Sequence, residues 1–227
     1  PSLPSGANGF PLGGGMVEWQ GEILAASEDG IKAWDPSTGT WSTHWSSTQY
    51  SEVYEIWTDG TWLAFGASEN SGWGSDAAVI FEDNSGTQTT VLSTANGDFS
   101  NAYPISMEAC AGRIWTAFFQ LSGGANVIGV DPNGVASTVE LDGQDLGTNA
   151  RPSALTCVGN NLHIGFYQSN AGITVWDASG NQRSTRLTTA NGLSPDPVMY
   201  DAMTVMGTSA NPLVVAGHLM QTGSGGY

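Results

Sequence analysis

The chain has 227 residues, a formal net charge of −16 and 10% aromatic residues, and only 11% of its residues are charged. Its five basic residues are too few to neutralise the phosphates of a nucleic acid or the anionic surface of a membrane, which argues against both as partners. The 40% hydrophobic content excludes a disordered chain, and no apolar run reaches the length of a transmembrane helix.

One short phrase recurs along the chain. Residues 30–35 read Gly-Ile-Lys-Ala-Trp-Asp and residues 172–177 read Gly-Ile-Thr-Val-Trp-Asp, while weaker copies end at Asp83 and Asp131. The four aspartates are 48, 48 and 46 residues apart. A period of this length indicates a repeat architecture, in which each copy is one supersecondary unit.

Each unit is predicted to hold four short strands. The first is mixed in polarity and ends at a turn that often contains glycine. The second is the most apolar, as expected for a strand buried on both faces. The third ends at the repeating aspartate, which begins a turn, and the fourth is more polar. In the last complete unit the first, second and fourth strands are predicted at residues 154–158, 162–166 and 183–187, and the third strand is predicted to end at Asp177.

Four-stranded units of this length predict an all-β fold, a β-propeller of about five blades. The whole chain, residues 1–227, is predicted to form one domain with units at about 17–52, 53–103, 104–151 and 152–197. A partial unit at 198–227 would combine with residues 1–16. Two closures stay open: a five-bladed ring completed by these terminal pieces, or a fragment of a larger propeller. The ring is favoured because an open edge exposes unpaired backbone.

The repeat resembles the propeller repeats of two-component regulator sensors. Residues 172–180, 187–193 and 213–217 carry the resemblance best: the Gly-Ile-x-x-Trp-Asp phrase with its turn, the Ala-Asn-Gly-Leu linker and the apolar second strand. The second unit departs from the pattern, with Glu82 in place of the aromatic residue before Asp83. The resemblance implies an extracytoplasmic sensing or ligand-binding domain. A low lysine content with much Ser, Thr, Gly and Asn also favours an exported protein.

Sequence signatures of catalysis and metal binding are missing. There is no Gly-x-Ser-x-Gly, His-Glu-x-x-His, Cys-x-x-Cys or phosphate-loop motif. The aspartate turns offer oxygens to Ca²⁺ but lack the ligand set of an EF-hand loop, so hairpin-turn chemistry is preferred for them. No cofactor is expected, and Ca²⁺ binding is kept as the alternative. Cys110 and Cys157 are predicted to be free buried thiols, because equivalent points on neighbouring first strands are expected to exceed disulfide reach.

Three glutamates, Glu18, Glu55 and Glu108, fall in the first strands of successive units, and Asp201 falls in that of the last. In a propeller the first strand lines the central channel. These carboxylates could therefore form a ring that binds a cation or supplies an acid–base pair for glycoside chemistry. The simpler alternative is a solvated channel wall.

Aromatic residues in the loops supply the other candidate site. Trp73 stands between glycines in a polar loop, and Tyr50, Phe99 and Tyr103 lie in linkers on the same face of the propeller. They could stack on a sugar or on a partner's side chain. We therefore expect a non-catalytic module that binds a small molecule, carbohydrate or protein outside the cytoplasm. The alternatives are a glycoside hydrolase or lyase that uses channel carboxylates, and a repeat scaffold that joins missing blades or another copy.

Overall fold

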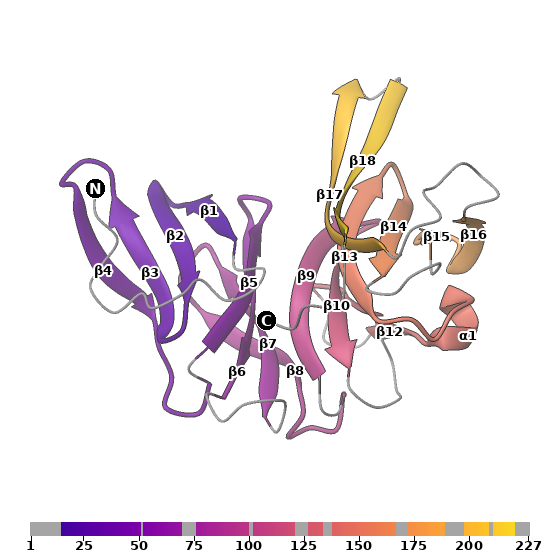
Figure 1. Ribbon diagram of the computed structural model, residues 1–227. Coiled ribbons are helices and arrows are strands. Elements are labelled where there is room, and N and C mark those ends of the chain that lie inside the picture. Colours follow the sequence, from indigo (N-terminus) through magenta and orange to yellow (C-terminus); the bar gives the residue numbers. More distant parts are fainter. Residues whose placement is uncertain are drawn as a thin grey trace.

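The computed structural model describes residues 15–50, 52–69, 76–99, 102–120, 127–133, 138–166, 172–188, 198–208 and 211–220. Within these ranges the chain forms four antiparallel four-stranded sheets and one two-stranded sheet. The sheets follow one another around a curved row, with the inner strands side by side (Figure 1). The predicted all-β propeller of four full blades and a partial one is confirmed.

Each blade takes its strands from one consecutive stretch of sequence, and we number the blades in chain order. Blade 1 holds β1 (Met16–Trp19), β2 (Glu22–Ser27), β3 (Gly30–Asp35) and β4 (Thr40–Trp45). Blade 2 holds β5 (Glu52–Thr58), β6 (Trp62–Ser68), β7 (Ala77–Asp83) and β8 (Gln88–Ser93). Blade 3 holds β9 (Ala102–Cys110), β10 (Arg113–Gln120), β11 (Val127–Val130) and β12 (Thr138–Leu141).

Blade 4 holds β13 (Pro152–Val158), β14 (Asn161–Phe166), β15 (Ile173–Asp177) and β16 (Gln182–Leu187). A short helix, α1 (Gly143–Leu146), connects blades 3 and 4. The last sheet contains β17 (Val198–Thr208) and β18 (Asn211–Met220). None of the helices in the described ranges has the length and hydropathy needed to cross a membrane.

The repeating aspartate closes the hairpin between the third and fourth strands. The Asp35 carboxylate accepts the backbone N–H of Ser37 at 2.7 Å, and the Asp177 carboxylate accepts that of Ser179 at 3.1 Å. Hydrogen bonds to the ionised carboxylate lower the pKa of both aspartates. The predicted turn role is confirmed, and the sequence period therefore counts hairpins.

Adjacent blades pack through apolar layers. Leu24 and Phe65 belong to the layer between blades 1 and 2, and Phe81 and Phe118 to the layer between blades 2 and 3. Trp115 lies in the layer between blades 3 and 4 and is fully buried. Because side chains alternate along a strand, the inner strands β5, β9 and β13 each send one set toward the preceding blade and the other toward the following blade.

Cys110 and Cys157 form a disulfide with their Cα atoms 5.6 Å apart, so the prediction of two free thiols is wrong. The prediction placed both cysteines at equivalent positions because each stands two residues before a turn glycine. The two hairpins differ, however: Cys110 is the last paired residue of β9, whereas Val158 follows Cys157 as the last paired residue of β13.

This offset of one residue turns the two cysteines to opposite faces of their sheets. Cys110 lies in the apolar layer between blades 3 and 4, and Cys157 packs against that layer from the other side. A side chain of one blade that points toward the next blade can come within disulfide reach of a side chain of that next blade that points back toward it. The bridge joins the inner strands of blades 3 and 4.

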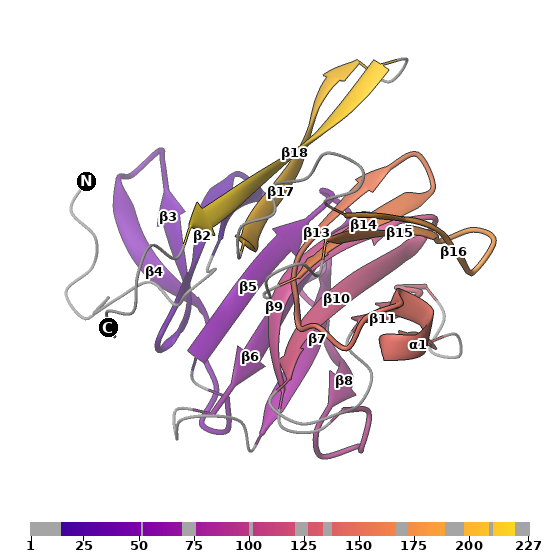
Figure 2. The same cartoon turned by 45° about the vertical axis from the view of Figure 1, so that its right-hand side comes forward.

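The two-stranded sheet of β17 and β18 projects beyond the other blades, as both views show (Figures 1 and 2). Its inner strand β17 contacts β13 and β14 of blade 4. The expected closure of the ring through residues 1–14 and 221–227 lies outside the described residues.

Candidate functional site

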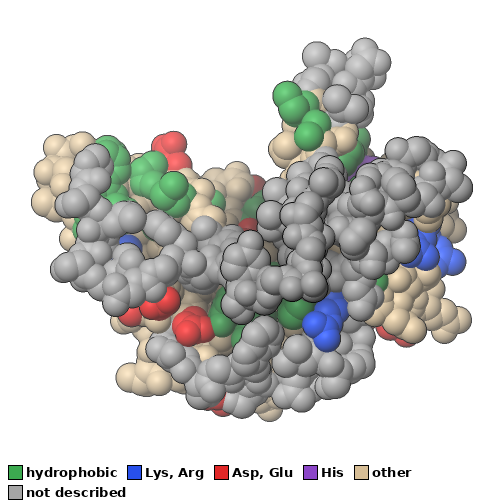
Figure 3. Space-filling view, in the orientation of Figure 1, with side chains coloured by type: hydrophobic (Ala, Val, Ile, Leu, Met, Phe, Trp, Pro, Cys, Tyr) green, Lys and Arg blue, Asp and Glu red, His purple; other side chains and the backbone are tan. Residues whose placement is uncertain are grey.

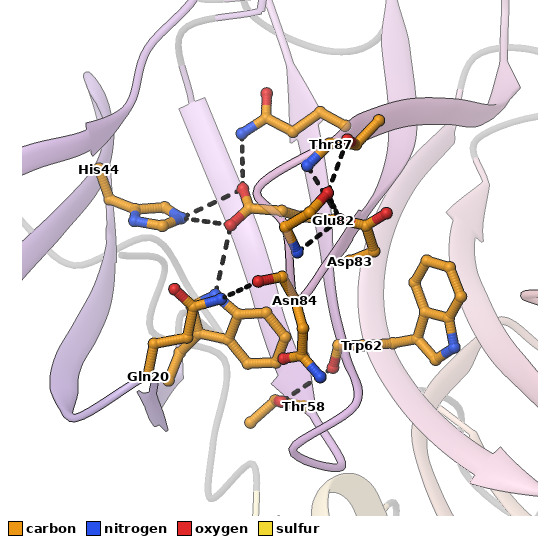
Figure 4. Close-up of polar contacts among 11 residues, drawn as sticks. Gln20, His44, Thr58, Trp62, Glu82, Asp83, Asn84 and Thr87 are labelled. Atoms are coloured by element: carbon orange, nitrogen blue, oxygen red, sulfur yellow. Dashed lines mark hydrogen bonds and ion pairs between the residues drawn. The ribbon is translucent and has the colours of Figure 1, made fainter.

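A buried carboxylate joins blades 1 and 2. Glu82, on β7, is 2% exposed and faces blade 1. Its Oε1 accepts the indole N–H of Trp19 at 3.3 Å, and its Oε2 accepts the amide of Gln88 at 2.6 Å. The Nε2 atom of His44, on β4, lies 3.2 Å from the same carboxylate. Figure 4 shows the His44 ring pointing toward the Glu82 carboxylate.

Glu82 occupies the place that the repeat gives to an aromatic residue. Trp34 and Trp176 precede Asp35 and Asp177, and in blade 4 this side chain packs against blade 3. In blade 2 the same position holds a carboxylate whose polar partners satisfy it. The departure of Glu82 from the repeat was visible in the sequence, but its partners were not, because Trp19 and His44 come from another blade.

Glu55 and Glu108 lie on the inner strands β5 and β9, as predicted for channel carboxylates. Burial raises the pKa of Glu55 to about 8. Burial also raises the pKa of Glu108 to about 7, and the hydrogen bond from the backbone N–H of Ala109 opposes that rise. Both side chains keep partial contact with solvent.

The burial of Glu55 has a local cause. Its partner across the β5–β6 ladder is Gly66, and a Cβ on that glycine would overlap the Pro104 ring and crowd the Met107 side chain of blade 3. The missing side chain lets these apolar groups approach the sheet beside the carboxyl. Loss of water around the carboxyl favours its neutral form.

The three predicted glutamates do not form a ring at one level. Counted back from the last pair of each hairpin, Glu55 stands two residues farther from the turn than Glu108. Glu18 is displaced from Glu108 by one residue and so projects to the other face of its strand. The side chain of Asp201 lies outside what the structure describes.

The predicted aromatic residues of the linkers are buried. Tyr50, Phe99 and Tyr103 are 8%, 6% and 6% exposed. Phe99 packs against Phe118 with ring centroids 4.4 Å apart. Trp73 lies outside the described residues. Ligand binding by these four residues stays a prediction. The three that are described, Tyr50, Phe99 and Tyr103, are buried and pack against other side chains of the protein.

Tyr54 and Glu52 were missed by the sequence analysis. Tyr54 is the extra residue of a β-bulge in β5, between Val53 and Glu55. Its ring lies 5.1 Å from that of Tyr103, and its hydroxyl donates to the Glu52 carboxylate. Burial and that hydrogen bond raise the pKa of Tyr54. A bulge commonly redirects a side chain near a functional site, yet its presence depends on strand pairing that the sequence does not display.

An arginine was also missed. The guanidinium of Arg151 lies over the ring of Phe119, 4.9 Å from the centroid. Phe119 is directly opposite Tyr103 in the β9–β10 ladder, so both side chains emerge on one face of that sheet. Glu52, Tyr54, Tyr103, Phe119 and Arg151 thus form a continuous row, which we call the aromatic row. It crosses blades 2, 3 and 4, from the beginnings of β5 and β9 and the end of β10 to the residue before β13.

Other polar side chains make local contacts within their hairpins. The ring Nδ1 of His163 lies 3.2 Å from the Asn161 carbonyl oxygen. The carboxylates of Asp83 and Asp131 accept turn N–H groups at 2.8 Å. In the part of the chain that the structure describes, no three Asp, Glu, His or Cys side chains are grouped as metal ligands would be.

The sheets define the chain as a β-propeller, and comparison with solved structures agrees. The extracellular domain of the putative hybrid two-component system BT4673 from Bacteroides thetaiotaomicron matches 90% of the chain with a TM-score of 0.61 and 14% identity. The chain spans about a quarter of that domain, 25% of its length.

Two further matches have other titles. A putative gluconolactonase matches 89% of the chain and is itself covered to 73%, with a TM-score of 0.53 and 12% identity. The calcium-binding protein regucalcin of Agrobacterium tumefaciens matches 74% of the chain and is covered to 58%, with a TM-score of 0.50 and 15% identity. At these identities the likeness establishes the fold alone. No protein-family profile and no curated protein matches the chain.

Proposed function

We propose that the chain is a non-catalytic binding module of the sensor type, which recognises a small molecule, carbohydrate or protein outside the cytoplasm. The aromatic row is the observation that carries the proposal. It combines stacking surfaces from Tyr54 and Phe119 with a carboxylate at one end and a guanidinium at the other. Aromatic faces with a few placed polar groups are typical of ligand sites.

Two observations support a location outside the cytoplasm. The Cys110–Cys157 disulfide suits an oxidising compartment. The matches from Bacteroides thetaiotaomicron are titled extracellular domains of two-component systems.

The negative charge is unevenly distributed along the chain: Lys32 is the only basic residue before Arg113. In Figure 3 most of the visible acidic side chains lie on the side of blades 1 and 2, and most of the visible basic ones over blades 3 and 4.

Calorimetric titration with neutral and uronic-acid oligosaccharides tests the proposal. We expect binding that is weakened by Tyr54→Ala, which removes a stacking face, and by Arg151→Ala, which removes the cation. Arg183→Ala is the matched control, because that guanidinium instead bonds the carbonyl oxygens of Gln144 and Asp145 in helix α1. Binding that survives both row substitutions would exclude the aromatic row as the site. Repeating the titration with added Ca²⁺ tests whether a cation takes part.

An enzyme is the second candidate, because Glu55 and Glu108 lie on neighbouring inner strands and both have raised pKa values. A glycosidase needs one protonated and one ionised carboxyl group at a defined separation. Glu55 and Glu108, however, stand at different distances from their hairpin turns and have different neighbours. This difference favours the binding module. Hydrolysis of an aryl glycoside that Glu55→Gln and Glu108→Gln both abolish, while Glu28→Gln does not, would establish the enzyme instead.

A further inference from the structure

Arg151 differs from the other basic residues in what its side chain contacts. Lys32 is paired with the carboxylate of a neighbouring aspartate at 2.8 Å. Arg183 and Arg186 donate to backbone carbonyl oxygens of helix α1 and its C-terminal cap. The Arg151 guanidinium instead lies over the Phe119 ring, 4.9 Å from the centroid. Within the ranges that the structure describes, it has no hydrogen bond and no ion pair.

Arg113 also lacks a polar partner among the described residues, but its surroundings are different. Its Nε atom is buried and forms no hydrogen bond there. Arg113 is directly opposite Cys110 in the β9–β10 ladder, and opposite residues of a ladder point to the same face of the sheet. The side chain therefore lies beside the disulfide, in the layer between blades 3 and 4. Arg151 is the arginine that combines unused N–H donors with an aromatic ring.

The chain on either side of Arg151 holds its backbone in place. Ala150 is buried, and its N–H donates to the Thr148 hydroxyl oxygen at 3.1 Å. Pro152 follows Arg151, is buried and begins β13. A residue before proline is restricted to extended conformations. Because the backbone and the contact with Phe119 already limit the freedom of the side chain, little further ordering is needed when a ligand binds.

A guanidinium in this setting suits a carboxylate. The contact with the Phe119 ring uses the positive charge of Arg151 and needs none of its N–H groups as hydrogen-bond donors. These groups can therefore form the two parallel N–H···O bonds that arginine makes to a carboxylate. The chain carries a net charge of −16 with five basic residues, so most of its surface repels an anion. Arg151 supplies a local attraction at a defined position of the aromatic row.

The other end of the aromatic row has the reverse polarity. The Glu52 carboxylate accepts the Tyr54 hydroxyl, and an ionised carboxylate accepts hydrogen bonds but donates none. Tyr103 is buried between the two ends: its ring lies 5.1 Å from that of Tyr54, and it is opposite Phe119 in the β9–β10 ladder. The row therefore offers donors to an anion at the blade 4 end and an acceptor to hydroxyl groups at the blade 2 end.

We propose that the aromatic row selects ligands in which a carboxylate is attached to a ring, and that Arg151 is the residue that selects them. The inference rests on the proposed function, because it specifies the ligand class of the same site. The carboxylate is bound by the Arg151 guanidinium, the ring lies along Tyr54 and Phe119, and hydroxyl groups of the ligand donate to Glu52. A sugar acid and an aromatic acid share this chemistry.

Calorimetric titration of each acid and of its methyl ester tests the inference, since the ester removes the charge and keeps the ring. Trigalacturonic acid is the sugar acid, and ferulic acid is the aromatic acid. We expect one of the two acids, which identifies the kind of ring, to bind more tightly than its ester by on the order of tenfold. Arg151→Gln should remove this preference. Arg151→Lys keeps the charge but loses the planar group, so it should retain part of the preference.

Arg183→Gln is the matched control, because it removes one positive charge from blade 4 outside the aromatic row. The preference for the acid should persist in this variant. Equal affinities for acid and ester, with binding that Tyr54→Ala weakens, would overturn the inference and leave the binding module in place. A preference that survives Arg151→Gln also overturns it. If none of the four compounds binds, the ligand class is wrong, and titration with neutral oligosaccharides then decides the proposed function separately.

Discussion

The layers between blades 1 and 2 and between blades 3 and 4 differ in how they are joined. The first contains a buried carboxylate, Glu82, with three polar partners from both blades. The second contains the Cys110–Cys157 disulfide. The apolar packing is similar in kind, since aromatic and aliphatic side chains fill both layers. The comparison shows that one repeat architecture accepts a directional polar contact or a covalent one at equivalent interfaces.

The layer between blades 3 and 4 has a second reinforcement in helix α1. The Asp142 side chain caps the first turn, and Thr174 of β15 donates its hydroxyl to the Leu146 carbonyl oxygen at 2.7 Å. Arg186 donates to the Gly147 carbonyl oxygen. Carbonyl groups at the helix C-terminus are thus satisfied by residues of blade 4. Blade 3 is therefore joined to blade 4 at two places: by the disulfide at its inner strand, β9, and by helix α1, which follows its outer strand, β12.

Removal of the disulfide should have the largest effect on stability. The cysteines are 47 residues apart, and the chain-entropy estimate for a loop of this length is about 4 kcal/mol. We expect Cys110→Ala/Cys157→Ala to lower the free energy of unfolding by about that amount in urea titrations. The reduced wild-type protein is the control and should lose a similar amount. A loss under about 1 kcal/mol would mean that packing alone holds blades 3 and 4 together.

Truncation of Glu82 should have the next largest effect on the free energy of unfolding. Glu82→Ala leaves the buried indole N–H of Trp19 and the Gln88 amide without their acceptor, which should cost about 3 kcal/mol. Glu28→Ala removes an exposed turn carboxylate and serves as the control. Chemical denaturation measures both. Equal stability of the two variants would show that the polar contacts between blades 1 and 2 are dispensable.

Neutralisation of Glu55, which lies between blades 2 and 3, should change how the stability of the protein depends on pH. The pKa of this carboxyl is about 8 in the folded protein, against 4.5 as its ordinary value. The folded state therefore binds more protons between these values, and the free energy of unfolding falls as pH rises from about 4.5 to 8. We expect this fall to be smaller in Glu55→Gln.

Urea titrations at several pH values measure the effect, with Glu28→Gln as the control that keeps the wild-type profile. The raised pKa of Glu108 contributes in the same direction up to about pH 7, so part of the fall should remain in Glu55→Gln. If Glu55→Gln reproduced the wild-type profile in full, the burial of Glu55 beside Pro104 and Met107 would not control its titration.

The sequence by itself determined the blade. The period of the Gly-Ile-x-x-Trp-Asp phrase, the apolar second strands and the turns after Asp35 and Asp177 are local features, because each depends on residues close together in the chain. They sufficed to predict four-stranded antiparallel units and a propeller. They also identified Glu82 as a departure from the repeat.

Only the tertiary structure decided what lies between the blades. The Cys110–Cys157 bridge depends on a difference of one residue in hairpin pairing, which reverses the face that a side chain occupies. The aromatic row likewise depends on the bulge at Tyr54 and on the ladder that sets Tyr103 opposite Phe119. Contacts between blades join residues about one repeat apart, and sequence periodicity specifies their spacing along the chain but not the direction in which each side chain points.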